Sequence, residues 1–256
     1  VVLRVRDVEY VNEWHKKMLD KISFDVRRGE ILGIAGVEGN GQKELVDMLF
    51  GFLTPNAGTV TMQSENLLGL SQQKLRDKGV ALIPEDRMLY GIAGSASIEE
   101  NLISDRSAEK RLNHGPLFNM KAIHDEADKL IEDYAVLCKS RKQQVGMLSG
   151  GNIQKVLLGR EIWLAPKVLI TAYPVRGLDI GASYNIYRVL NEQKKKGVAV
   201  LFIGEDLDVL KSISDRLMVI HGGEVVDIVD PEKVTKEDIG MMMLGHKPGA
   251  EGGEAV

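Results

Sequence analysis

Short apolar runs alternate with amphipathic segments along most of the chain. Residues 2–8 and 22–26 alternate apolar and charged positions, which is typical of strands with one buried face. Fully apolar runs predict strands buried on both faces, over residues 31–35, 80–84, 168–172 and 198–203. Helical spacing predicts helices over residues 43–50, 67–79, 182–196 and 207–213. This alternation predicts an α/β fold in which helices cover both faces of a mostly parallel sheet.

The pattern changes over residues 86–142, where helical spacing dominates. The apolar residues at this spacing are Ile98, Leu102, Ile123, Ala127, Leu130 and Tyr134. We therefore expect a helical insertion over residues 87–165. The core is expected to comprise residues 1–86 and 166–247 and to include a small antiparallel β-subdomain. Residues 248–256 contain few apolar residues and predict a flexible tail.

Composition and charge exclude several classes of protein. The 33 basic and 37 acidic residues leave a net charge of −4, which argues against nucleic acid as a partner. The single cysteine, Cys138, cannot form an internal disulfide and indicates a reducing compartment. No apolar run approaches the roughly 20 residues that span a bilayer. The five histidines lack metal-ligand spacing, so we expect no metal site. The chain begins with Val1 rather than Met, so we expect it to belong to a longer protein.

A glycine-rich turn joins the predicted strand 31–35 to the following helix. The turn contains Gly36, Gly39, Asn40 and Gly41. This spacing lets backbone N–H groups surround a phosphate at a helix N-terminus. However, Gln42 stands where a lysine is required, Lys43 where a Mg²⁺-binding hydroxyl is required, and Glu44 follows. One lysine–phosphate pair is worth about 4 kcal/mol before desolvation, so we expect weak nucleotide binding. The alternative is an ordinary turn that needs glycine for its backbone.

A second motif opens the predicted helix that ends near Leu164. Its residues are Leu148, Ser149, Gly150, Gly151, Asn152 and Gln154. A serine N-cap followed by two glycines exposes backbone N–H groups at the positive end of a helix dipole, where a phosphate can bind. The alternative is a plain capped helix, but two glycines in the first turn are a poor way to build one.

This second motif resembles the signature motif of ATP-binding cassette (ABC) transporter ATPases. The glycine turn resembles their Walker A loop, Glu85 stands at the Q-loop position, and Asp179 stands in the D-loop. The resemblance covers residues 2–245 and implies a P-loop NTPase fold. It is strongest to the second, C-terminal cassettes of fused two-cassette ATPases that drive monosaccharide and nucleoside importers.

The chain departs from this family at the positions that carry catalysis. Ala172 and Tyr173 stand where the Walker B strand would end in Asp-Glu, and Glu205 stands where the switch histidine is expected. Phosphoryl transfer depends almost entirely on placed charge and metal. We therefore expect the chain's own site to be degenerate, with no catalytic residue intact and weak or no ATP hydrolysis.

Family ATP sites form between two head-to-tail cassettes. The resemblance therefore implies that Ser149, Gly150 and Gly151 complete a partner cassette's site, which holds most of the ATP and Mg²⁺. It implies that Asp179 crosses the same interface. It also implies an aromatic ring that stacks on adenine, with Tyr10 favoured over Trp14; the alternative is that either ring packs on the small β-subdomain. The implied partners are a second cassette fused upstream, transmembrane permease subunits and, indirectly, a solute-binding protein. The implied location is the cytoplasmic face of the membrane, with a permease helix held near Glu85.

Two other functions remain open from the sequence. In the first, the cassette hydrolyses ATP itself, with Lys43 replacing the missing lysine. In the second, the chain is a soluble ABC protein that acts away from membranes. The net charge of −4 disfavours the second, because such proteins need basic surfaces or long charged linkers.

Overall fold

The computed structural model describes residues 1–246, so the predicted tail 248–256 lies outside the described residues. The chain divides into two compact units. The first comprises residues 1–82, 167–173 and the part from residue 187 onward. The second comprises residues 83–166 and 174–186, so it holds the predicted helical insertion together with a later segment. Among the described residues, no helix combines the length and apolar character that a membrane span requires.

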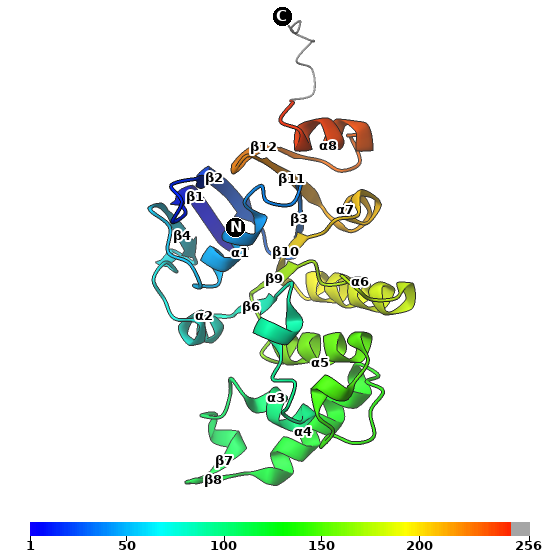
Figure 1. Ribbon diagram of the computed structural model, residues 1–256. Helices are drawn as coiled ribbons and strands as arrows, with labels where there is room; N and C mark the ends of the chain where they lie inside the picture. The colour runs from blue at the N-terminus through cyan, green and yellow to red at the C-terminus, as the bar shows by residue number, and fades with distance from the viewer. Residues whose placement is uncertain (247–256) are drawn as a thin grey trace, which may run out of the picture. The chain divides into compact units, whose positions relative to one another are not determined.

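A six-stranded sheet forms the centre of the first unit, in the order β12-β11-β3-β10-β9-β6 (Figure 1). Strand β3 is parallel to β10 and β11, β10 is parallel to β9, and β12 is antiparallel to β11. Every residue of β3, β6, β9 and β10 is buried, as their apolar runs predicted. The strands are β3 (Ile31–Ala35), β6 (Val80–Ile83), β9 (Val168–Ala172), β10 (Ala199–Ile203), β11 (Arg216–His221) and β12 (Glu224–Val229).

The first unit also contains a four-stranded antiparallel sheet, with the strand order β2-β1-β4-β5. In β1, Leu3 lies opposite Val26 of β2 and Met62 of β4, and all three side chains are buried in one hydrophobic core. This is the predicted antiparallel β-subdomain. The strands are β1 (Leu3–Val11), β2 (Lys17–Val26), β4 (Ala57–Met62) and β5 (Glu65–Asn66).

Within residues 1–246, five helices pack against or follow the strands of the two sheets. Figure 1 shows α8 beside β11 and β12. The helix predicted over residues 67–79 begins only at Gln72, because Ser71 caps it, and ends at Lys78, before Gly79, which has a φ of +96°. The helices are α1 (Gln42–Leu49), α2 (Gln72–Lys78), α6 (Ile180–Lys195, whose first residues belong to the second unit), α7 (Leu207–Ile213) and α8 (Lys236–Met243).

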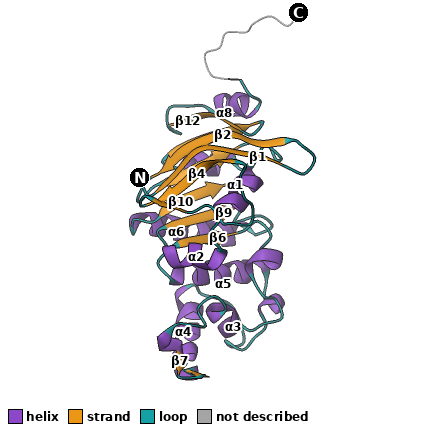
Figure 2. Cartoon of the chain, turned by 90° about the vertical axis from the view of Figure 1, so that its left-hand side faces the viewer, coloured by secondary structure: helices purple, strands orange, loops and turns teal. Residues whose placement is uncertain are grey.

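The second unit is mostly helical (Figure 2). Ile98, Leu102, Ile123, Ala127 and Leu130 are buried, as their spacing predicted. The elements are η1 (Arg87–Gly91), α3 (Ile98–Ile103), η2 (Lys110–Leu112), β7 (Asn113–His114), β8 (Leu117–Phe118), α4 (Met120–Asp133), η3 (Val145–Met147) and α5 (Gly150–Trp163).

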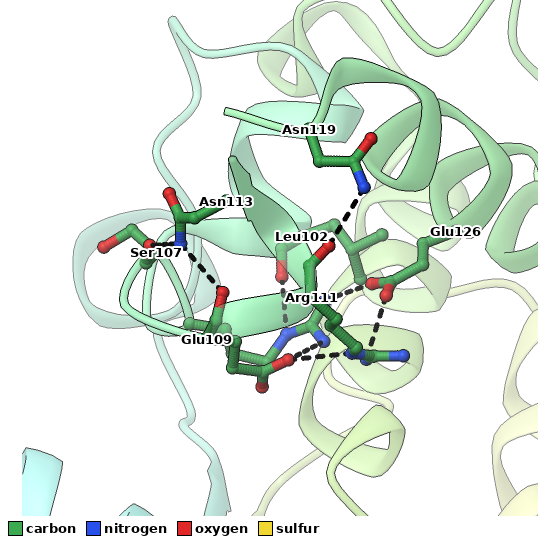
Figure 3. Close-up of polar contacts among 8 residues, drawn as sticks. Leu102, Ser107, Glu109, Arg111, Asn113, Asn119 and Glu126 are labelled. Carbon is green, nitrogen blue, oxygen red and sulfur yellow. Dashed lines mark hydrogen bonds and ion pairs between the residues drawn. The ribbon is translucent and has the colours of Figure 1, made fainter. Parts of the chain in front are cut away.

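A buried ion-pair network supports the β7–β8 hairpin (Figure 3). The side chain of Arg106 is 1% exposed, and its Nη2 lies 2.7 Å from Oε2 of Glu126. Arg111 reaches the other oxygen of Glu126 at 2.9 Å and Glu109 at 3.0 Å. The Asn113 amide donates to the backbone carbonyls of Ser107 and Glu109. Because each buried charge has a partner, the network is tolerated inside the unit.

Candidate nucleotide-contacting sites

Three neighbouring parallel strands bring the predicted nucleotide-site positions to one edge of the large sheet. Ile203 of β10 lies beside Ile34 of β3 and beside Ala172 of β9. The carboxyl ends of these strands therefore carry the glycine loop, Glu205, and the Ala172–Tyr173 pair. This edge is where parallel α/β sheets bind their ligands. The structure thus brings together, within the first unit, the positions that the sequence associated with one nucleotide site.

The glycine loop is held by its own backbone and by a neighbouring turn. Gly39 and Gly41 have φ values of +87° and +104°, which other residues rarely adopt. A Cβ on Gly41 would lie 2.6 Å from the carbonyl oxygen of Met18. Asn40 Oδ1 accepts a hydrogen bond from the Gly222 N–H at 2.9 Å. The backbone conformation and the close packing of the loop therefore require these glycines, independently of any ligand.

Gln42 occupies the lysine position without supplying a charge. Its side chain is 2% exposed, and its Nε2 donates to the Val37 carbonyl at 3.1 Å, within the loop. Glu38 and Glu44 place two carboxylates on the same segment, with Glu44 in the first turn of α1. A triphosphate at this loop would therefore meet a neutral amide and two negative charges, which oppose its binding.

Lys43 lies on the surface of α1. Its side chain is 69% exposed, and its Nζ lies 2.5 Å from Oδ2 of Asp47, one helical turn further along. The ammonium group is thus directed along the helix surface. This position offers no support to the idea that Lys43 replaces the missing lysine.

The sheet edge does not suit a Mg²⁺ ion. Mg²⁺ needs several oxygen ligands, and Ala172 is a buried methyl group while Tyr173 carries no carboxylate. Glu205 is exposed at the same edge. Among residues 1–246, no group of three or more His, Cys, Asp or Glu side chains could hold a metal. The donors present therefore do not fit the metal that an active cassette requires.

The two candidate adenine-stacking rings differ in exposure. Tyr10, at the end of β1, is half-buried and packs against the hydrophobic core. Trp14, in the turn that follows, is 78% exposed. Stacking by Tyr10 stays a prediction, and the structure gives Trp14 the more accessible ring.

The signature motif forms the start of α5 in the second unit. Ser149 occupies the N-cap position, as predicted, with extended backbone angles (φ −65°, ψ 155°). Its hydroxyl makes no capping hydrogen bond. Instead, Oγ accepts a hydrogen bond from Nδ2 of Asn152 at 2.8 Å. The first N–H groups of α5 are therefore left without their usual side-chain acceptor, which favours binding of an external anion.

The two glycines of this motif also have a packing role. A Cβ on Gly151 would lie 3.2 Å from Cβ of Ala182, and one on Gly150 would lie 3.3 Å from Nη2 of Arg87. Close packing is therefore a second reason for these glycines, besides the phosphate that the sequence suggested. They also let α5 approach the start of α6.

Arg87 and Arg176 were not predicted as site residues. The guanidinium of Arg176 pairs with the carboxylate of Glu85, at the Q-loop position. Nη1 of Arg87 donates to the Arg176 carbonyl at 3.1 Å. No periodic pattern marks these residues, and the Glu-Asp-Arg sequence at 85–87 was the available signal.

The remaining predicted residues differ in accessibility. Asp179 is exposed, and its Oδ1 accepts a hydrogen bond from the Ala182 N–H at 2.9 Å, which caps α6. Leu148 and Gln154 are buried, with 9% and 1% of their surface exposed. Both side-chain atoms of the Gln154 amide lack a hydrogen-bond partner. Contact between Gln154 and a partner's nucleotide stays a prediction, which the burial of its side chain does not favour.

A model of the ABC transporter family matches residues 19–174 of the chain. The chain belongs to the ABC transporter family. This ABC transporter cassette is 38% identical to the glucose import ATP-binding protein TsgD13 of Haloferax volcanii, over 95% of the chain and 45% of that protein. It is 34% identical to the nucleoside import ATP-binding protein NupA of Lactococcus lactis subsp. cremoris, over 96% of the chain and 48% of that protein. The cassette therefore spans about half the length of these curated relatives.

Solved ABC structures share the fold of this cassette. MJ1267, an ATP-binding cassette of an ABC transporter, matches with a TM-score of 0.77 at 22% identity, covering 95% of this chain and 97% of that one. The dimeric post-hydrolysis structure of MJ0796, bound to ADP and Pi, matches with a TM-score of 0.75 at 18% identity, covering 90% and 98%. These matches confirm the predicted fold class, a mostly parallel sheet with an antiparallel β-subdomain and helices.

Proposed function

We propose that this chain is the second cassette of a fused two-cassette ATPase in an importer for a simple sugar or a nucleoside. Its relatives are named for glucose and nucleoside import and are about twice its length, which supports both parts of the proposal. In this role the chain completes the first cassette's ATP site and hydrolyses little or no ATP at its own.

One contrast between two helix starts carries the proposal. At α5, Ser149 is exposed and leaves the first N–H groups uncapped, so the positive end of the dipole can receive a phosphate. At α1, the loop offers Gln42 in place of a lysine and carries Glu38 and Glu44 nearby. The first arrangement favours a phosphate, and the second opposes one.

The roles of the binding residues follow from this contrast. Ser149 and the N–H groups of Gly150 and Gly151 would hold the terminal phosphate of a nucleotide bound by the first cassette. Exposed Asp179 would face the same cassette. ATP and Mg²⁺ would be held mainly by the first cassette, which would supply the metal's charge for phosphoryl transfer.

The second unit also offers a surface for a permease. Met88, Leu89 and Tyr90 of η1 are 46%, 68% and 59% exposed, and they closely follow Glu85. An exposed apolar group of this kind is typical of a protein interface. Binding of a permease helix here would place the cassette at the cytoplasmic face of the membrane. A solute-binding protein would act on it only through the permease.

A comparison of variants in the assembled transporter tests the proposal. Ser149→Ala should reduce solute uptake and ATP turnover about tenfold or more, because it removes a hydrogen bond to a charged group. Gln42→Ala and Lys43→Ala should leave both rates within about twofold of wild type. The proposal fails if Ser149→Ala is neutral. Loss of turnover in Lys43→Ala would instead support hydrolysis at this cassette's own site.

A further inference from the structure

Asn152 connects the signature serine to a loop that precedes the motif. It is 8% exposed, and its Oδ1 accepts a hydrogen bond from the Leu137 N–H at 2.8 Å. Its Nδ2 donates to Oγ of Ser149, also at 2.8 Å. All three residues belong to the second unit. One buried amide therefore makes both contacts.

The direction of these two hydrogen bonds follows from the chemistry of the groups. A backbone N–H can only donate, so the side-chain atom of Asn152 that faces Leu137 must be the carbonyl oxygen. The –NH₂ group then faces Ser149, and because it can only donate, the hydroxyl oxygen must accept. The hydroxyl proton of Ser149 is consequently not used in this contact. Ser149 is exposed, so its proton is available to an external acceptor.

We propose that Asn152 is a positioning residue that makes the Ser149 hydroxyl a hydrogen-bond donor toward an anion. The inference rests on the proposed function, in which that anion is the terminal phosphate of the first cassette's nucleotide. A phosphate accepts hydrogen bonds, so a hydroxyl whose proton were already engaged would present only lone pairs and repel it. An orientation set in advance also avoids reorganisation when the phosphate arrives.

An aspartate at position 152 separates this role from a merely structural one. Asn152→Asp has nearly the same shape, and one carboxylate oxygen can still accept the Leu137 N–H. The other oxygen can only accept, so it would draw the Ser149 proton toward itself and reverse that hydrogen bond. The loop stays attached while the hydroxyl loses its donor role.

A double-mutant cycle in the full-length protein, assembled with its permease, tests the inference. The variants are Ser149→Ala, Asn152→Asp and the double variant, and ATP turnover at saturating ATP and the KM for ATP are measured for each. We expect each single variant to lower turnover about 10- to 100-fold. The double variant should be no more than about threefold slower than Ser149→Ala, because the two residues act through one hydroxyl.

Each other outcome has a distinct meaning. Neutral Ser149→Ala would overturn the proposed function itself. If Ser149→Ala lowered ATP turnover but Asn152→Asp did not, the positioning role alone would be overturned. A further loss of about tenfold in the double variant would assign the effect to the added charge and would also overturn it.

Cys138 provides a readout that does not depend on activity. Burial raises the pKa of its thiol, so it should alkylate slowly at neutral pH while the adjacent Leu137 is held. Asn152→Ala removes the acceptor for the Leu137 N–H and should speed Cys138 alkylation, whereas Asn152→Asp should not. Faster alkylation in Asn152→Asp would mean that its defect is structural and would overturn the inference.

Discussion

The guanidinium of Arg176 pairs with the carboxylate of Glu85, although 91 residues separate them in the chain. The backbone carbonyl of Arg176 also accepts a hydrogen bond from Arg87 at 3.1 Å. Glu85 and Arg87 thus contact the side chain and the backbone of one arginine. A glutamine at position 85 could not form this ion pair.

Exchanging the two charges tests this pair. Arg176→Glu or Glu85→Arg alone should lower the free energy of unfolding by up to about 1 kcal/mol, because both side chains are more than one-third exposed and water screens the interaction. The double exchange should restore most of the lost free energy of unfolding, measured by urea denaturation. The exposed pair Arg188–Glu192 is a matched control in which the single exchanges should have no more effect. If the double exchange did not restore the free energy of unfolding, the two side chains would not be energetically coupled.

Restoring the missing charges should create a nucleotide site. We expect Gln42→Lys with Lys43→Ser and Ala172→Asp to bind Mg·ATP at least about tenfold more tightly than wild type, because a lysine–phosphate pair is worth several kcal/mol before desolvation. Equilibrium titration with and without Mg²⁺ measures this. Lys43→Ala should bind as weakly as wild type. Tight, Mg²⁺-dependent binding by wild type, lost in Lys43→Ala, would contradict the degenerate-site account.

Gly151 should be sensitive to a single methyl group. Gly151→Ala places its Cβ 3.2 Å from Cβ of Ala182, so we expect this close contact to cancel the gain in unfolding free energy of about 0.5–1 kcal/mol that helix propensity provides. Gly240→Ala in α8 is the matched control, since its Cβ would meet nothing within 4 Å. That variant should gain about 0.5–1 kcal/mol from helix propensity. Equal stability of the two variants would contradict the packing role.

Replacing Glu126 alone should strongly lower the free energy of unfolding. Glu126→Leu leaves the 1%-exposed Arg106 side chain without its main partner, which should cost about 3–5 kcal/mol of unfolding free energy. The double variant Arg106→Leu with Glu126→Leu should recover most of this, while Arg111 keeps its pair with Glu109. Chemical unfolding of the three proteins measures both effects. If the double variant were as unstable as Glu126→Leu, an uncompensated charge would not be the cause.

The sequence predicted the fold well because buried strands have a strong local pattern. The runs at β3 and β9 match the structure residue for residue. Helix α8 was missed, although Thr235 and Asp238 form a capping box whose spacing is visible in the sequence. The hairpin of β7 and β8 was missed because strands of two residues show no alternation.

The sequence indicated candidate site residues but could not predict the hydrogen bonds that they make. The replacements at Gln42 and Ala172 are visible in the sequence, since each stands at a motif position. The acceptor role of the Ser149 oxygen is not visible, because it depends on Asn152 and on the distant N–H of Leu137. Local spacing predicted a serine N-cap with exposed N–H groups, and the structure adds that the Ser149 oxygen accepts a hydrogen bond from Asn152.

The number of ATP molecules hydrolysed per pair of cassettes distinguishes one active ATP site from two. The proposed two-cassette protein, assembled with the proposed permease, would be loaded with labelled ATP and released into a single turnover with Mg²⁺. We expect one ATP to be hydrolysed per pair of cassettes, at a rate that Ser149→Ala lowers about tenfold or more. Two ATP molecules hydrolysed per pair, or an unchanged rate in Ser149→Ala, would contradict the proposed function.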